Sequence, residues 1–217
     1  MRYTVCVFDF DYTLADATPG IVKSMNYSLD RLGLNPENRD DIKRTVGMTL
    51  KEAFHKLTGV TDTQSTDLFI THFKEMADKV MTDNTSLFDD TVHVLSELKY
   101  LNCNTAIVTS KAHYRIDEVL GHNGISELVD YIVGFEDVDA AKPSPEGLLR
   151  VIQHFSCDKG SVLYIGDSLI DANTAVNAGV DFAAVITGTT TEDEFAAHPF
   201  VHIANNLTGL LEYIKGR

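Results

Sequence analysis

The chain has 217 residues, and its 32 acidic and 18 basic side chains give a formal net charge of −14 at pH 7. Hydrophobic residues make up 44% and charged residues 23%, a balance that excludes a disordered or fibrous chain and allows a buried core. A pI near 4.8 disfavours nucleic acid and anionic membranes as main partners, because both bind basic surfaces.

The three cysteines are widely spaced and form no CxxC pair, so we expect reduced thiols in place of disulfides or zinc ligands. The first apolar run ends at Asp9 and does not resemble a signal peptide. No stretch approaches the roughly 18 apolar residues of a membrane span. These features predict a protein of the cytoplasm.

Six short apolar runs predict strands buried on both faces, because their apolarity is continuous and does not alternate. In chain order they are Val5–Phe8, Thr105–Val108, Tyr131–Val133, Val162–Ile165, Ala183–Ile186 and Val201–Ala204. Between the later runs lie amphipathic segments with helix-start signals, such as Ser144 as N-cap and Pro145 as first helical residue. Strands alternating with helices predict an α/β fold: a doubly wound, Rossmann-like core with a mostly parallel sheet.

Residues 15–83 break this rhythm and show only helical patterns. Thr18-Pro19 precedes an amphipathic run over Ile21–Leu32, Thr49 precedes Leu50–Leu57, and a third run covers Asp67–Met81. We therefore predict an all-helical subdomain at 15–83, inserted into a core formed by residues 1–14 and 84–217.

Polar residues follow four of the predicted strands. Ligands of open parallel sheets bind outside the carboxyl ends of the strands, so we expect these residues to converge. They are Asp9 and Asp11, Thr109 and Ser110, Lys142, and Asp167 with Asp171. Taken singly, each has an ordinary interpretation: turn residues for the first acids, a solvated loop lysine, and a capping box for Ser168 with Asp171.

Asp9 and Asp11 are two residues apart, so in extended chain they point the same way about 7 Å apart. Such carboxylates repel each other unless a cation or a raised pKa relieves them. Oxygen ligands of this kind suit Mg²⁺, which shares its coordination with substrate phosphates. A hydroxyl and a lysine could hold the phosphate, and one carboxylate could attack it, so the set predicts phosphoryl transfer.

Four segments resemble, in order, the four motifs of the haloacid dehalogenase superfamily: DFDYTL (9–14), VTSK (108–111), AKPSPE (141–146) and GDSLID (166–171). The position of the helical insertion is similar to that of members with a small helical cap. Residues 14–21 and 108–111 look most like the phosphoglycolate phosphatase branch. This resemblance implies a Mg²⁺-dependent phosphatase that acts on a small phosphorylated metabolite through an aspartyl-phosphate.

The resemblance also implies the role of each motif residue. Asp9 would attack phosphorus and bind Mg²⁺. Asp11 would protonate the leaving alcohol and then activate water, while its carbonyl binds the metal. Asp167 would be a metal ligand, and Asp171 would act through water or Lys142. The phosphate would be held by Thr109, Ser110 and Lys142.

In this family the helical cap supplies specificity, which makes Arg44, Gly47 and Lys51 candidates for contacts with the substrate. Family members usually carry glycine where this chain has Tyr12, also a candidate substrate contact. Because glycine is permissive, tyrosine predicts either an unstrained backbone there or an aromatic ring at the site entrance. The substrate stays open among phosphoglycolate, sugar phosphates, nucleoside monophosphates and pyrophosphate.

Three alternatives remain. The string GDSL at 166–169 matches the name-giving motif of a family of serine esterases, which would make Ser168 the nucleophile, although the Asp193–His198 spacing does not fit that family. A non-enzymatic phospho-accepting receiver would be shorter and lack the helical insertion. A mutase resembling β-phosphoglucomutase would carry a cap histidine where this chain has Gly20-Ile21.

Overall fold

The computed structural model describes residues 2–216 and divides into two units. The sheet unit contains the residues up to Ala15 and those from Leu87 onward, and the helical unit is Asp16–Ser86. The sequence places these boundaries at 14/15 and 83/84. The two boundaries between the units lie within the strands of a two-stranded sheet, β2 (Ala15–Asp16) and β3 (Ser86–Leu87). Strand β2 lies in the segment for which the sequence predicts only helices.

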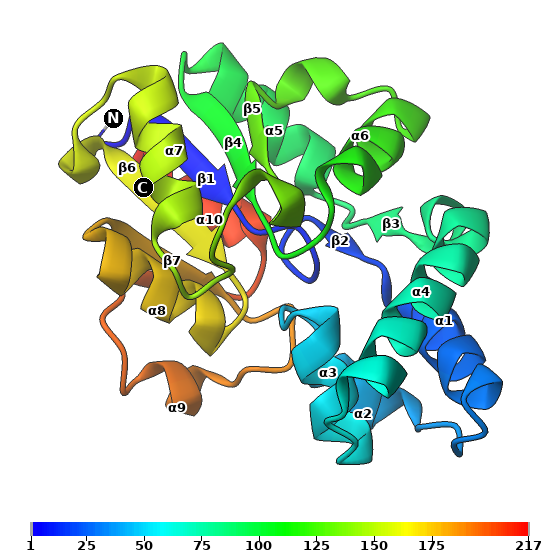
Figure 1. Ribbon diagram of the computed structural model, residues 1–217. Helices are drawn as coiled ribbons and strands as arrows, with labels where there is room; N and C mark the ends of the chain where they lie inside the picture. Colours follow the sequence, from blue (N-terminus) through cyan, green and yellow to red (C-terminus); the bar gives the residue numbers. More distant parts are fainter. Residues whose placement is uncertain (1, 217) are drawn as a thin grey trace. The chain divides into compact units, whose positions relative to one another are not determined.

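The sheet unit is built on six parallel strands in the order β5-β4-β1-β6-β7-β8 (Figure 1). Their bounds are Val5–Phe8 (β1), Asn104–Val108 (β4), Tyr131–Val133 (β5), Val162–Gly166 (β6), Asp181–Val185 (β7) and His202–Ala204 (β8). The predicted doubly wound α/β fold is confirmed. The observed bounds differ most from the predicted ones in β7. This strand begins at Asp181, two residues before the predicted Ala183, because Asp181 pairs with Leu163 of β6.

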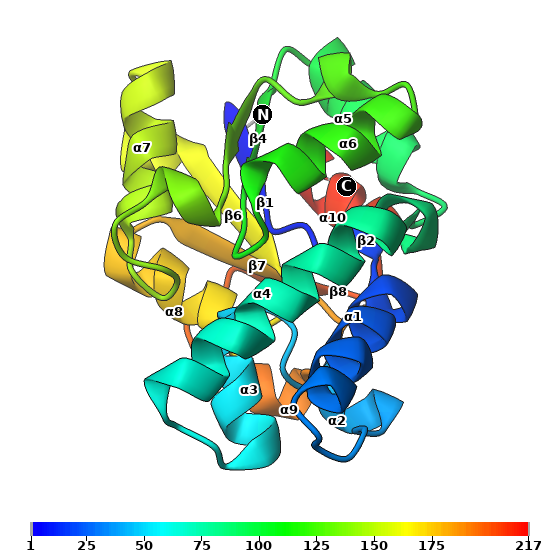
Figure 2. The ribbon, with the colours of Figure 1, turned by 45° about the vertical axis from the view of Figure 1, so that its right-hand side comes forward.

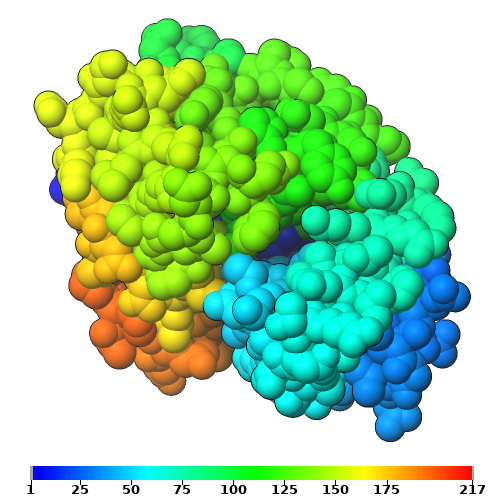
Figure 3. All heavy atoms as spheres, viewed as in Figure 1, coloured from blue at the N-terminus to red at the C-terminus, as the bar shows by residue number. Residues whose placement is uncertain are grey.

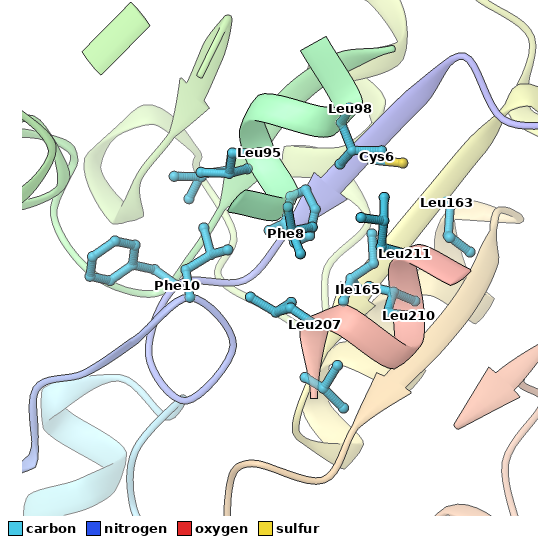
Figure 4. Packing of buried hydrophobic residues seen from close by; sticks show 14 of the residues in the cluster. Cys6, Phe8, Phe10, Leu95, Leu98, Leu163, Ile165, Leu207, Leu210 and Leu211 are labelled. Atoms are coloured by element: carbon cyan, nitrogen blue, oxygen red, sulfur yellow. The ribbon is translucent and has the colours of Figure 1, made fainter. Parts of the chain in front are cut away.

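Side chains leave each strand alternately to two separate cores. On one face Cys6 and Phe8 of β1 pack with helices α5 (Thr91–Tyr100), α6 (His113–His122) and α10 (Leu207–Lys215). Figure 4 shows Phe8 and Ile165 directed towards leucines of α5 and α10. On the other face Val5 and Val7 pack with α7 (Glu146–Phe155), α8 (Leu169–Ala178) and α9 (Glu192–Phe195).

Figure 2 shows the two helical layers of the sheet unit on either side of its strands. In the space-filling view of Figure 3, the atoms of α7 and the segment before it form a continuous surface over one face. Three 3-10 helices complete the unit: η2 (Ser126–Leu128), η3 (Phe135–Asp137) and η4 (Lys159–Ser161). Helix α7 begins one residue later than predicted, with Pro145 as its N-cap in place of Ser144.

The order of the strands creates a switch point beside β1. The chain builds β4 and then β5 on one side of β1, then crosses to build β6, β7 and β8 on the other. The loops after β1 and β6 therefore diverge from neighbouring strand ends, which is where open α/β sheets bind ligands.

The helical unit contains α1 (Thr18–Arg31), α2 (Arg39–Lys43), α3 (Leu50–Thr58), α4 (Thr63–Val80) and η1 (Thr82–Asn84). Its own core includes stacked Phe54 and Phe69, whose ring centroids are 4.5 Å apart. As predicted, Thr49 caps α3, through a capping box with Glu52. The sequence missed α2, because a helix of five residues with Ile42 as its one apolar side chain carries too short an apolar pattern. No helix within residues 2–216 combines the length and apolarity that a bilayer crossing requires.

Candidate active site

Asp9 lies directly after β1, where its backbone N–H donates to the carbonyl of Ile165 in β6 at 2.8 Å. The following chain turns at once, since the Phe10 carbonyl accepts from the N–H groups of Thr13, Leu14 and Ala15. Asp9 is only 3% exposed. The strand end thus holds a carboxylate below the protein surface, at the switch point of the sheet.

Lys142 lies between two buried carboxylates. Its Nζ is 3.0 Å from Asp9 Oδ1 and 2.7 Å from Asp171 Oδ1. The hydroxyl of Tyr164 accepts from Lys142 Nζ at 3.2 Å and donates to Asp171 Oδ1 at 2.8 Å. Burial opposes the charge of Lys142, but attraction to Asp171 and Asp9 outweighs it and raises its pKa. Lys142 therefore stays cationic beside Asp9.

Asp171 uses its second oxygen to cap a helix. Its Oδ2 accepts from the Ser168 hydroxyl at 2.6 Å and from the Ser168 N–H at 3.2 Å, while Ser168 Oγ accepts from the Asp171 N–H at 3.3 Å. The capping-box interpretation is thus correct and coexists with the contact to Lys142. It also gives the Ser168 hydroxyl a structural duty, unlike the exposed nucleophile of an esterase.

Asp167 precedes helix α8, whose N-cap is Ser168, so Asp167 and Asp171 do not lie on one helix face. The two still converge, because the chain is extended at Ser168 and the helix then brings Asp171 back. Thr13 Oγ1 donates to Asp167 Oδ1 at 3.4 Å. On its other side Asp167 contacts Gly188, where an added Cβ would lie 1.9 Å from Oδ2.

Ligand oxygens of Asp9, Asp167 and Asp171 lie within 4.8 Å of one another, all in buried side chains. Burial raises the pKa of Asp9 to about 6, against the attraction of Lys142, which lowers it. Burial, with repulsion from Asp171 and Asp9, raises the pKa of Asp167 well above its usual range. Asp9 Oδ1 is buried, and among the described residues its close polar contact is the ion pair with Lys142 Nζ, which does not have the geometry of a hydrogen bond.

These observations fit a divalent cation with oxygen ligands, because a cation would offset the charge that burial opposes. Asp9 and Asp167 have carboxylate oxygens for it. Asp171 is engaged with Lys142, Tyr164 and Ser168, which suits the role of orienting its neighbours. The Asp11 carboxylate is engaged by Lys111.

The partner of Asp11 is Lys111, whose Nζ lies 2.7 Å from both carboxylate oxygens. Sequence reasoning did not single out Lys111, and it missed Tyr164, Thr13 and Gly188 as well. Each of these looks ordinary in the sequence: a loop lysine, a tyrosine within an apolar strand, a turn threonine and a loop glycine. Their importance depends on residues far along the chain.

Thr109 and Ser110 follow β4, and with Lys142 they line a small hollow at the ends of β4 and β5. Thr109 Oγ1 accepts from the Lys111 N–H at 3.2 Å, so its own proton stays available for an anion. The structure therefore brings the three candidate phosphate-binding residues together within the sheet unit.

Tyr12 overturns the expected unstrained backbone, since its φ is +61°, in the left-handed region that glycine favours. The residue is only 4% exposed, so its ring is also not an open aromatic surface at an entrance. Its backbone is held by two bonds: the N–H donates to the Ala15 carbonyl at 2.7 Å, and its own carbonyl accepts from Thr187 Oγ1.

The cap candidates lie within the helical unit. Arg44 follows α2 and pairs with Asp41 at 3.2 Å, both largely exposed. Gly47 has a φ of 93° in the turn before α3, and Lys51 is exposed in the first turn of α3. Their contact with a substrate stays a prediction.

Comparison with known proteins shows which family the chain resembles. The chain is 30% identical over 188 residues to the phosphoglycolate phosphatase of Rhodobacter capsulatus, covering 84% of each chain. It is 27% identical over 184 residues to the pyrophosphatase PpaX of Bacillus velezensis, covering 85% of this chain and 83% of that protein.

Among solved structures, a haloacid dehalogenase-like hydrolase from Bacteroides fragilis matches with a TM-score of 0.94 and 44% identity, over 96% of this chain and 100% of that one. The family profile described as haloacid dehalogenase-like hydrolase matches residues 6–185. With the motif residues gathered at the switch point of the sheet, this match shows that the chain belongs to the haloacid dehalogenase-like hydrolases, and its likeness is to their phosphoglycolate phosphatase branch.

Proposed function

We propose that the protein is a Mg²⁺-dependent phosphatase that hydrolyses a small phosphate monoester through an aspartyl-phosphate on Asp9. The observation that carries the proposal is the position of Asp9: a buried carboxylate at the end of β1 whose Oδ1 lies 3.0 Å from Lys142 Nζ, beside the buried Asp167 and Asp171. The phosphatase names of its relatives support the same class of reaction.

In the first step Asp9 attacks phosphorus, and the bond from phosphorus to the leaving oxygen breaks. Lys142 offsets the charge of the nucleophile and of the transferring group, since it is a cation held within the buried site. Thr109 donates its hydroxyl proton to a phosphate oxygen. Asp11, in its protonated form, gives its proton to the leaving oxygen and becomes a carboxylate.

In the second step Asp11 takes a proton from water, which attacks phosphorus, and the bond to Asp9 breaks to release inorganic phosphate. The residues that would hold Mg²⁺ are Asp9 and Asp167, with the backbone carbonyl of Asp11. When bound, the ion supplies charge that offsets both the carboxylates and the phosphate.

Phosphoglycolate is our leading substrate, because the curated relative with 30% identity carries that name. Pyrophosphate is the second, after the relatives named pyrophosphatase. Arg44, Gly47, Lys51 and Tyr12 stay our candidates for selecting the leaving group. A panel of phosphorylated metabolites, assayed with Mg²⁺ and with chelator, separates these substrates from sugar phosphates and nucleoside monophosphates.

A mutase is disfavoured by the absence of the cap histidine that such an enzyme would carry where this chain has Gly20-Ile21. Position 20 is also closely packed in the helical unit, since an added Cβ would lie 3.3 Å from Met81 Cα. Net hydrolysis is therefore favoured.

The first test is Asp9→Asn, which keeps the shape of the side chain and removes the nucleophile. We expect loss of phosphate release by at least about a thousandfold, because removal of a nucleophile leaves only residual catalysis. Assays with p-nitrophenyl phosphate measure it, and Asp89→Asn at an exposed site is the control. Cleavage by Asp9→Asn at the wild-type rate would refute the mechanism.

A further inference from the structure

The ion pair of Lys111 with Asp11 lies within the candidate active site, and neither the motif roles nor the family match accounts for it. Lys111 Nζ donates to both Asp11 oxygens at 2.7 Å, although the residues are 100 positions apart in the chain. The two side chains are only 9% and 13% exposed. An ion pair buried to this extent restrains the positions of its two side chains far more than an exposed surface pair does.

The surroundings fix the lysine as well. Its N–H donates to Thr109 Oγ1 at 3.2 Å, which ties its backbone to the residue that follows β4. Its ammonium group lies 5.7 Å from the ring centroid of Phe10, which is fully buried beside Asp11. Lys111 is thus anchored at the end of one strand and reaches the acid at the end of the next.

The chemistry of Asp11 depends on such an anchor. Under the proposed function this carboxyl first gives a proton to the leaving oxygen and later takes one from water, so it must stay at one place between the steps. Because a single Nζ holds both oxygens, one oxygen can turn towards the substrate while the other keeps its bond.

We propose that Lys111 is the positioning residue for Asp11, so that it governs protonation of the leaving group while having no direct role at phosphorus. The inference rests on the proposed function. It predicts that substitution of Lys111 lowers kcat/KM most for substrates whose leaving group needs a proton.

The experiment compares Lys111→Met with wild type on p-nitrophenyl phosphate, phenyl phosphate and β-glycerophosphate. We use kcat/KM, because it reports the first transfer of the phosphoryl group. We expect a loss at least about tenfold larger for phenyl phosphate and β-glycerophosphate than for p-nitrophenyl phosphate, whose leaving group departs without a proton. Lys111→Arg should lose less kcat/KM than Lys111→Met on phenyl phosphate and β-glycerophosphate.

A double-mutant cycle with Asp11→Asn supplies the second readout. If Lys111 acts through Asp11, Lys111→Met should change kcat/KM less than about twofold in the Asp11→Asn background. Lys99→Met is the control, since it removes an exposed lysine 3.2 Å from Asp130, and thermal melting checks that each variant is folded.

An equal loss on all three substrates, a rise confined to KM, or multiplicative effects in the cycle would each overturn the role of Lys111. These outcomes are separate from failure of the proposed function. That failure would appear as turnover by Asp9→Asn, whatever Lys111→Met does.

Discussion

Gly188 shows how a residue without a side chain can shape a carboxylate site. The loop after β7 passes so close to Asp167 that a Cβ at position 188 would lie 1.9 Å from Oδ2 and 2.7 Å from Cγ. Real Cβ atoms do not approach other atoms this closely, so Gly188→Ala must displace either the loop or Asp167.

We therefore expect Gly188→Ala to weaken Mg²⁺ activation by roughly tenfold or more, as for other changes that disturb the support of a metal ligand. A titration of activity against Mg²⁺ concentration measures it. The matched control is Gly160→Ala, where an added Cβ meets nothing within 4 Å. Wild-type Mg²⁺ dependence in Gly188→Ala would show that Asp167 does not need this close approach.

Some residues of the candidate active site can be predicted from the sequence, and others cannot. Asp9, Thr109 and Lys142 could be found because strand ends converge at the edge of a parallel sheet. Tyr164 could not, because within an apolar strand a tyrosine looks like any core residue until its hydroxyl meets Lys142 and Asp171. Tyr12 was misjudged because the turn holds this residue in the left-handed conformation although it is not a glycine.

At the scale of the element, the start of α8 serves stability and the active site together. Asp171 accepts from Ser168 through Oδ2 and contacts Lys142 through Oδ1. Gly166, just before, allows this approach, since a Cβ there would lie 2.5 Å from Asp171. The helix cap thus orients the carboxylate that orients the lysine.

Ser168→Ala should lower the free energy of unfolding by about 1 kcal/mol, the usual effect of losing an N-cap. It should also reduce kcat severalfold, because Asp171 loses the contact that fixes one oxygen. Denaturation by urea and steady-state kinetics measure the two effects. Asn206→Ala is the comparison, since Asn206 caps α10 through the Gly209 N–H at 2.9 Å and should cost similar stability without altering kcat. Equal activity in the two variants would count against the dual role.

Strands were easier to predict than helix boundaries for a physical reason. The six apolar runs are buried on both faces by the two cores, so hydrophobicity alone marks them. Helix starts depend on local polar contacts: α1 begins at Thr18, whose N–H donates to Asp16 Oδ1 at 2.7 Å, a contact that the Thr18-Pro19 signal does not reveal.

At the scale of the whole molecule, the formal charge of −14 includes a few acids that are buried at the strand ends of the sheet unit. Without a cation, the pKa of Asp9 is raised by burial from 3.8 to about 6, and that of Asp167 is raised too. Between pH 3.8 and about pH 6, the two pKa values of Asp9, the folded protein binds more protons at Asp9 than the unfolded chain does. Protonation of Asp9 therefore stabilises the folded protein fully below about pH 4, and this stabilisation is lost as the pH rises through about 6.

It follows that Asp9→Asn should be more stable than wild type in metal-free buffer at pH 7.5, by about 2–3 kcal/mol at most and hence several degrees in Tm. The advantage should shrink as the pH is lowered towards 4, since wild-type Asp9 then becomes neutral. Mg²⁺ should raise the Tm of wild type more at pH 7.5 than at pH 5, because it binds the ionised carboxylates.

Thermal melts of both proteins across this pH range, with Mg²⁺ and with chelator, measure these differences. Asp89→Asn removes one exposed acid and should follow wild type at every pH, so it accounts for the change in net charge. A metal-free Asp9→Asn that melts below wild type at pH 7.5 would mean that Lys142 fully compensates the buried charge. In that case the cation would be needed for catalysis alone, and burial of the ionised Asp9 would not destabilise the folded protein.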